Sequence, residues 1–218
     1  AMFDASLYAR RLDQSEGVDM ITSSANNYYA GVTQKEVEKF YADMIDHNDP
    51  QPISYGLNSQ LTKDENGKVV ERVWKQGGMY GEAIDKILFW LEKASEVASP
   101  VQKPIIDALC EYYRSGNLRD FDKYNVLWVQ DIESNIDFVN GFIEDYGDPM
   151  GRKASWEANV SLRSDEATKR TELISANAQW FEDNSPINPA YRKAEVKGVS
   201  AKVITVATLA GDAYPATP

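Results

Sequence analysis

Glu144 and Tyr146 are the two residues whose types and spacing could do chemistry. They stand two positions apart in the stretch GFIEDYGDPMG, residues 141–151, which predicts a strand followed by a Pro/Gly turn. Side chains two apart on a strand share a face, so this pair would project together while Asp145 points the other way. A carboxylate beside a neutral phenol could hold an ammonium group and a polarised carbonyl oxygen. The alternative is that both side chains simply line the solvated face of a hairpin, as charged strand residues usually do.

The strand that carries this pair is predicted to form a hairpin with the segment after it. Its two arms are residues 138–146 and 153–162. Apolar and polar residues alternate along the second arm, which is typical of a strand with one face in the core. The apolar set is Ala154, Trp156, Ala158, Val160 and Leu162.

Amphipathic helices are predicted upstream of the hairpin. Thr33 and Glu36 form a capping box ahead of a helix that ends before Asn48. Apolar side chains at helical spacing predict two more helices, over about 84–98 and from 101 to about 115, which would pair antiparallel.

The remaining segments predict a mixture of short elements. A turn or short helix at about 118–124 leads into the segment that carries Trp128, and Ser164 is the expected N-cap of a third long helix reaching about Phe181. Residues 53–61 and 68–74 flank an Asn-Gly turn and predict a second hairpin. A final strand is expected over 199–209. Because helices and strands do not alternate regularly, we expect an α+β fold with antiparallel strands.

The overall composition is that of an ordinary soluble globular protein. The chain has 218 residues, of which 43% are hydrophobic and 26% charged, enough for one good core. The net charge of -11 argues against nucleic acid as a partner, because phosphates would be repelled. No apolar run approaches the roughly 18 residues of a membrane span, and no signal peptide opens the chain. We therefore expect no membrane partner and a cytoplasmic location.

The residues that usually carry hydrolytic chemistry are sparse in this sequence. His47 is the single histidine and stands at a predicted helix end, where a solvent-facing role is expected; Cys110 is the single cysteine and lies in an apolar helical stretch, where it would be buried. The sequence contains no His-Glu-Xaa-Xaa-His motif, no Gly-Xaa-Ser-Xaa-Gly elbow and no phosphate-binding glycine loop. The chain by itself thus supplies no metal site.

Several stretches together resemble the dipeptidyl peptidase III family of zinc exopeptidases. They are residues 142–151, residues 128–131 with Trp128 at the family's distance before Glu144, residues 27–33, residues 54–58 and residues 208–211. The resemblance covers most of the chain. Some members of that family are fused to a nudix module, whose glutamate-rich signature is absent here.

The resemblance implies a role for four residues. Glu144 matches the carboxylate that binds the free ammonium of the peptide, and Tyr146 matches the tyrosine that donates to the scissile carbonyl. Trp128 matches an aromatic residue of the substrate cleft, although plain core packing is an equal alternative for a tryptophan. Glu157 matches a further carboxylate of the cleft.

The family's zinc motifs would lie beyond Pro218, so the resemblance implies a fragment of a longer zinc-dependent peptidase that is inactive alone. Residues 1–163 and 194–218 would belong to the substrate-binding lobe, and residues 164–193 to a helical insert from the zinc lobe. Expected partners are short peptides with a free N-terminus and the rest of the parent chain. The alternative function is a standalone, non-catalytic peptide-binding domain.

Overall fold

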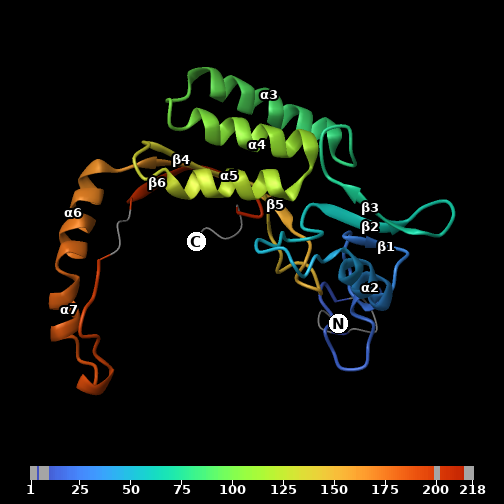
Figure 1. The fold of residues 1–218 in the computed structure, drawn as a ribbon, viewed down its shortest axis with the longest axis horizontal. Coiled ribbons are helices and arrows are strands. Elements are labelled where there is room, and N and C mark those ends of the chain that lie inside the picture. Colours follow the sequence, from blue (N-terminus) through green and yellow to red (C-terminus); the bar gives the residue numbers. More distant parts are fainter. Residues whose placement is uncertain (1–3, 5–9, 199–201, 214–218) are drawn as a thin grey trace.

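The computed structural model describes residue 4, residues 10–198 and residues 202–213. It is an elongated α+β structure, as predicted, with two three-stranded sheets. The first sheet lies at one end beside α2, the second sheet lies under helices α3, α4 and α5, and α6 and α7 extend away at the other end (Figure 1). The described part contains no helix long and apolar enough to cross a membrane.

The N-terminal unit is built around the first sheet. Strand β1 (Tyr29–Ala30) pairs parallel with β2 (Ser59–Lys63), which pairs antiparallel with β3 (Val69–Val73). The predicted Asn-Gly turn connects β2 and β3, and the predicted capping box of Thr33 and Glu36 begins helix α2 (Gln34–Met44). The short helix α1 (Met20–Ser23) is capped by Asp19. The first arm of the β2–β3 hairpin is shorter than predicted. It begins at Ser59 and not at residue 53, because residues 53–58 form turns.

Three helices pack together in the middle of the molecule. They are α3 (Gly81–Val97), α4 (Lys103–Ser115) and α5 (Leu118–Gln130). The pairing of α3 with α4 agrees with the prediction, whereas α5 is a full helix that includes Trp128 in its last turn. Asn117 begins α5 by accepting a hydrogen bond from the Arg119 backbone N–H at 2.9 Å. The core between these helices and the strands is largely aromatic and includes Tyr112, Tyr113, Phe121, Tyr124 and Phe142.

The second sheet carries the predicted hairpin. Strand β4 (Ile136–Glu144) pairs antiparallel with β5 (Ser155–Arg163), and β5 pairs antiparallel with β6 (Ile204–Gly211). One face packs on the helices, since the Trp156 indole N–H donates to the Tyr113 hydroxyl at 2.9 Å and that hydroxyl also contacts Asn140. Residues alternate between faces along a strand, so the other face carries the polar residues of β5. These are Ser155, Glu157, Asn159 and Ser161.

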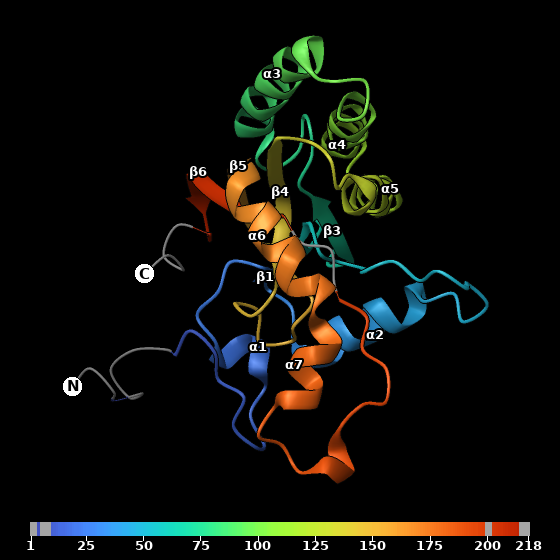
Figure 2. The same cartoon turned by 90° about the vertical axis from the view of Figure 1, so that its left-hand side faces the viewer.

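Helices α6 (Asp165–Ala176) and α7 (Ala178–Asn184) form an arm that leaves the second sheet after β5 and returns to it before β6 (Figures 1 and 2). Ser164 caps α6 as predicted, but the expected single helix is interrupted at Asn177. The short 3₁₀ helix Pro189–Tyr191 follows. Large apolar side chains on this arm remain exposed, among them Leu173, Trp180 and Tyr191.

Candidate functional site

The strand that leads to Tyr146 ends earlier than the sequence predicts. Strand β4 stops at Glu144, with a bulge between Phe142 and Glu144. The Asp148 backbone N–H donates to the Asp145 carbonyl at 2.9 Å, which closes a four-residue turn with Tyr146 and Gly147 at its centre. Tyr146 therefore stands on a turn and not on the strand. The expected second arm likewise begins at Ser155 and not at residue 153.

Glu144 and Glu157 nevertheless face the same side of the hairpin. Glu144 lies opposite Ser155, and residues opposite each other in an antiparallel pair share a face. Ser155 and Glu157 are two apart on β5, so their side chains also share that face. In agreement, the pKa of the Glu157 carboxyl is raised, first by burial and then by the negative charges of Glu144 and Asp212. The solvent side of the hairpin tip thus collects carboxylates.

The Tyr146 side chain joins this group of carboxylates. Its hydroxyl donates a hydrogen bond to the Asp212 carboxylate, and the Arg11 guanidinium lies 5.8 Å from its ring centroid. The hydrogen bond to Asp212, burial, and the charges of Asp212 and Glu144 raise the pKa of the Tyr146 phenol, against an opposing effect of Arg11. At neutral pH Tyr146 is therefore a neutral hydrogen-bond donor. Asp145 lines a different depression, beside Tyr55 and Arg152.

Asp212 is a member of this cluster that the sequence did not suggest. It follows β6, which reaches the site because Gly211 lies opposite Glu157. The Ser155 hydroxyl donates to Asp212 at 2.6 Å, and this bond, followed by the one from Tyr146, lowers the pKa of the Asp212 carboxyl. Only the pairing of β5 with β6 brings Asp212 to Tyr146. The sequence predicts the last strand but not its register against β5, so no sequence signal indicated that Asp212 would lie at this site.

Glu144, Glu157, Asp212 and Tyr146 form what we call the acidic tip of the hairpin. The charges of Glu144 and Asp212 contribute to raising the pKa of Glu157, so the three carboxylates lie close enough together to create a negative potential at one place. A cation entering the tip would be attracted by that potential. The Tyr146 hydroxyl could then donate to a neighbouring oxygen of the same ligand.

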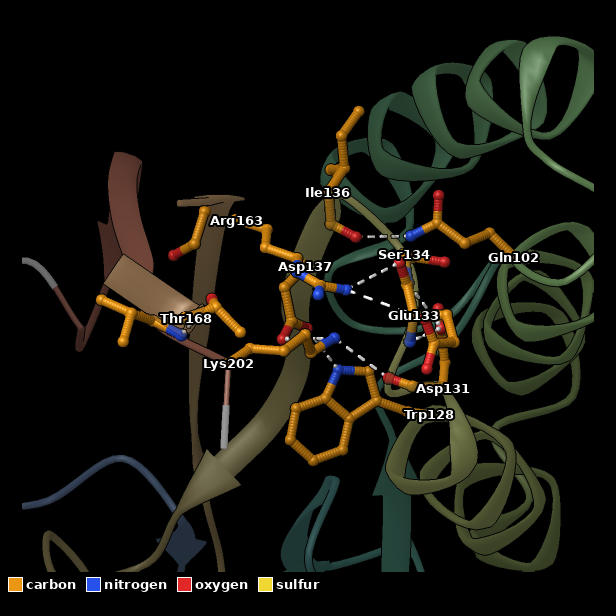
Figure 3. Close-up of polar contacts among 12 residues, drawn as sticks. Gln102, Trp128, Asp131, Glu133, Ser134, Ile136, Asp137, Arg163, Thr168 and Lys202 are labelled. Carbon is orange, nitrogen blue, oxygen red and sulfur yellow. Dashed lines mark hydrogen bonds and ion pairs between the residues drawn. The ribbon is translucent and has the colours of Figure 1, made fainter. Parts of the chain in front are cut away.

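Trp128 lies at the opposite end of the hairpin from the acidic tip. Its indole N–H donates to Asp137 at 3.0 Å, which fastens the end of α5 to the beginning of β4 (Figure 3). Asp137 precedes Glu144 by seven strand residues, which corresponds to roughly 20 Å. The indole is half-buried and packs against the edge of the core. The structure thus places Trp128 far from Tyr146 and does not bring the two together.

A group of ion pairs surrounds Trp128, in which Lys202, Asp137 and Arg163 are largely shielded from water. The Lys202 ammonium lies 3.3 Å from the Asp137 carboxylate and donates to the Asp131 carbonyl at 3.0 Å (Figure 3). Arg163 donates to the Glu133 carbonyl at 3.3 Å. Because Arg163 ends β5 and Lys202 precedes β6, these contacts hold the root of the α6–α7 arm.

The described residues do not supply a metal site. Within the ranges that the structure covers, no three His, Cys, Asp or Glu side chains are arranged to hold a metal ion. His47 is exposed, and burial raises the pKa of the Cys110 thiol to about 11, which is inconsistent with a nucleophile.

Comparison with protein families gives an extended match. The profile described as Peptidase family M49 matches residues 53–217, three quarters of the chain. The chain is 29% identical over 136 residues to Nudix hydrolase 3 of Arabidopsis thaliana, covering 62% of this chain and 17% of the relative. It is 26% identical over 140 residues to dipeptidyl peptidase 3 of Rattus norvegicus, covering 64% of this chain and 19% of the relative. The chain thus spans about a fifth of the length of these curated relatives.

Two solved structures share the fold. Dipeptidyl-peptidase III from Corallococcus sp. strain EGB matches with a TM-score of 0.59 and 24% identity, covering 91% of this chain and 36% of that one. DPP III from Caldithrix abyssi matches with a TM-score of 0.66 and 20% identity, covering 93% and 38% respectively.

Proposed function

Because this chain belongs to peptidase family M49, we propose that it is the substrate-binding part of a zinc-dependent dipeptidyl peptidase. The parent enzyme would release dipeptides from the N-terminus of short peptides. Its zinc would be held by residues outside this chain, supplying the activated water that attacks the peptide bond. This chain would be inactive alone.

The acidic tip is the observation that carries this proposal. Glu144, with Glu157 and Asp212 nearby, offers the negative potential that a peptide ammonium requires. The enzyme would thereby recognise a free amino terminus and set the distance from it to the cleaved bond. An N-acylated peptide has no such charge and would leave the carboxylates uncompensated.

Tyr146 would stabilise the carbonyl oxygen of the bond being cleaved. Its hydroxyl carries one proton to donate, and the Asp212 carboxylate is the acceptor that raises the pKa of the phenol. In the complex, the carbonyl oxygen would take the place of Asp212 as the acceptor. Such a donor acts most strongly as negative charge develops on that oxygen, where losing one donor typically costs about 3 kcal/mol.

Glu157 would bind near the ammonium as part of the acidic tip, whereas Trp128 would contact a more distant part of the peptide. Trp128 contacts Asp137, which stands roughly 20 Å along β4 from Glu144, so an extended peptide of about six residues, at about 3.3 Å per residue, would cover that length of the strand. Trp128 would then form an aromatic wall for the far end of a short peptide.

The proposal is tested by steady-state kinetics of the full-length parent protein. Tyr146→Phe is expected to lower kcat by one to three orders of magnitude. Glu144→Ala is expected mainly to raise KM for peptides with a free N-terminus, with little effect on N-acetylated ones. Tyr191→Phe and Glu65→Ala are matched controls, because both residues are exposed and distant from the tip.

Kinetics of both site variants equal to those of the controls would refute the roles assigned to Glu144 and Tyr146. A full-length protein that binds these peptides with zinc present but never cleaves them would instead favour the non-catalytic alternative.

A further inference from the structure

A buried polar network around Asp148 and Lys153 holds the turn that carries Tyr146. Tyr146 itself is 54% exposed, so packing of its own side chain does little to fix it. What fixes it is the backbone of residues 145–153, which connects β4 to β5 by two successive turns. Two charged side chains of this connection, Asp148 and Lys153, are almost completely buried.

Asp148 closes the connection upon itself. Its carboxylate accepts hydrogen bonds from the backbone N–H groups of Met150, Arg152 and Lys153, at 3.1, 2.9 and 2.8 Å. It also accepts one from the Tyr29 hydroxyl at 2.8 Å, which ties the connection to β1. One carboxylate thus gathers four donors, and three of them belong to the turn that follows Tyr146.

Lys153 ties the far end of the connection to the N-terminal unit. Its ammonium donates to the Tyr41 hydroxyl at 2.6 Å, to the Ser59 hydroxyl at 3.0 Å and to the Gly56 carbonyl at 3.2 Å. It also lies 5.4 and 5.0 Å from the ring centroids of Tyr29 and Tyr41. Helix α2 and strand β2 therefore both hold this one side chain.

The charge of Lys153 is balanced through two hydroxyl groups. Tyr41 and Ser59 each donate to the Glu71 carboxylate, at 2.7 and 2.6 Å, so their oxygens are free to accept from Lys153. The result is an ion pair between Lys153 and Glu71 bridged by hydroxyls. A fully satisfied buried network of this kind permits few alternative arrangements.

Gly147 limits the turn from the other side. A Cβ atom at this position would stand 2.8 Å from the Arg11 guanidinium and 3.3 Å from the Tyr28 hydroxyl. The turn around Tyr146 is therefore enclosed by the N-terminal segment on one side and by the Asp148 network on the other.

We propose that Asp148 and Lys153 are positioning residues for Tyr146, which set its hydroxyl relative to Glu144 without touching the peptide. The inference rests on the proposed function of Tyr146. Glu144 is held by the β4–β5 ladder and Tyr146 by the buried network, so disturbing the network changes their separation. Since a misplacement of about 1 Å can cost about a hundredfold in rate, the network would be felt in kcat.

The first test is a double-mutant cycle in the full-length enzyme. Asp148→Asn removes the charge while keeping the shape, and is expected to lower kcat at least tenfold with KM changed less than threefold. In a Tyr146→Phe background the same substitution is expected to cause no further loss, because the group through which it acts is gone. Equal losses in both backgrounds would overturn the inference.

Two further variants distinguish a specific effect on Tyr146 from a general loss of structure. Asp19→Asn is the matched control, because Asp19 also accepts three backbone N–H bonds but lies at the start of α1. It should lower the unfolding midpoint without changing kcat. Tyr29→Phe removes one donor to Asp148 at constant volume, so it replaces Asp148→Asn if that variant does not fold. Its expected loss in kcat is smaller, about twofold to fivefold, and also vanishes in the Tyr146→Phe background.

The second test does not depend on activity. With 3-fluorotyrosine incorporated into this chain, Tyr146 gives one ¹⁹F signal, assigned by its loss in Tyr146→Phe. We expect that signal to shift or broaden in Asp148→Asn and to stay unchanged in Asp19→Asn. An unchanged signal in Asp148→Asn would overturn the inference even if Tyr146 proves essential. Conversely, full activity of Tyr146→Phe would refute the proposed function, while a shifted signal would still support positioning.

Discussion

The two ends of the β4–β5 hairpin are both held by polar side chains, but in opposite ways. At the tip, Asp148 and Lys153 are 2% and 0% exposed, and each has hydrogen-bond partners on several elements. At the root, the ion pair of Asp137 with Lys202 is partly open to water, and Glu133 is mostly exposed. The tip carries Tyr146. The root, which is the opposite end of the hairpin at the start of β4 and the end of β5, carries the α6–α7 arm.

The difference teaches where rigidity is located in this chain. Water still reaches the root, where the Lys202 and Asp137 side chains are 16% and 21% exposed, so each contact there is partly screened and contributes less than a fully buried one. Buried charges are costly unless every donor and acceptor is matched, which leaves essentially one low-energy arrangement. The tip is therefore the fixed end of the hairpin, and the root is the compliant end.

The largest effect is expected when a buried charge at the tip loses its partner. Asp148→Ala should lower the free energy of unfolding by about 3–5 kcal/mol, because Tyr29 and three backbone N–H groups lose their acceptor. Asp137→Ala at the root should cost less, about 1–2 kcal/mol, because Lys202 and the Trp128 indole lose an acceptor at a place that water still reaches. Chemical denaturation of this chain measures both, and equal losses would remove the distinction between the two ends.

Titration of Lys153 should make the stability of the tip depend on pH. Burial lowers the pKa of the Lys153 ammonium to about 8, partly opposed by Glu71 and Asp148 and reinforced by Arg152. The unfolded lysine keeps its proton up to its ordinary pKa of 10.5, so above pH 8 the unfolded chain binds more protons. The contribution of Lys153 to the free energy of unfolding, measured as the difference between the wild type and Lys153→Met, should therefore rise by about 2 kcal/mol between pH 8 and pH 10.

Lys153→Met should abolish that rise, whereas Lys202→Met at the root should preserve it. The difference between variants is the quantity to measure, because burial also raises the pKa of several tyrosines, and their unfolded forms begin to ionise below pH 10 and lower the stability of every variant. These tyrosines include Tyr29, Tyr41, Tyr112, Tyr113 and Tyr124. Urea titrations at several pH values provide the measurement. The same dependence on pH in the wild type and in Lys153→Met would contradict the assignment.

Gly56 offers a smaller test of how tightly the tip is packed. Its carbonyl accepts from Lys153, its φ is +92°, and a Cβ would stand 2.7 Å from the Tyr41 ring. Gly56→Ala should cost about 2–3 kcal/mol, from backbone strain and overpacking together. Gly151→Ala also has positive φ but open space around the new methyl group, so it should cost about 1 kcal/mol. Thermal unfolding midpoints of the two variants should differ accordingly.

The smallest effect is expected at the root. Trp128→Phe removes the hydrogen bond to Asp137 but keeps an aromatic ring, and should cost about 1 kcal/mol. In the full-length enzyme the same variant should leave kcat unchanged. A fall in kcat comparable with that of Tyr146→Phe would show that the root is as closely coupled to chemistry as the tip.

Local sequence signals predicted most of the elements. The capping box of Thr33 and Glu36, the Asn-Gly turn and the N-cap Ser164 all appear as expected. The predicted ends of strands were wrong where the end is set by contacts with residues distant in the sequence. Strand β4 ends at Glu144 because Asp148 folds the next residues into a turn, and Asp148 does so through Tyr29, far away in the sequence.

The candidate site was only partly visible in the sequence. Glu144 and Tyr146 stand two apart, so residue types and spacing singled them out, although Tyr146 lies on a turn and not on the strand. Glu157 was indicated only by the family resemblance. Asp212 depends on the register between β5 and β6, which no residue type specifies. The separation of Trp128 from Tyr146 likewise follows from α5 running along the sheet to the start of β4.

By itself, the sequence determined the α+β class, the hairpin, and an acid and a phenol near its tip, because these follow from spacing between near neighbours. Tertiary structure alone decided that Asp212 meets Tyr146 and that Lys153 is buried against Tyr41 and Ser59. Those contacts join segments distant along the chain. Their geometry depends on how the sheets and helices pack, which local spacing does not encode.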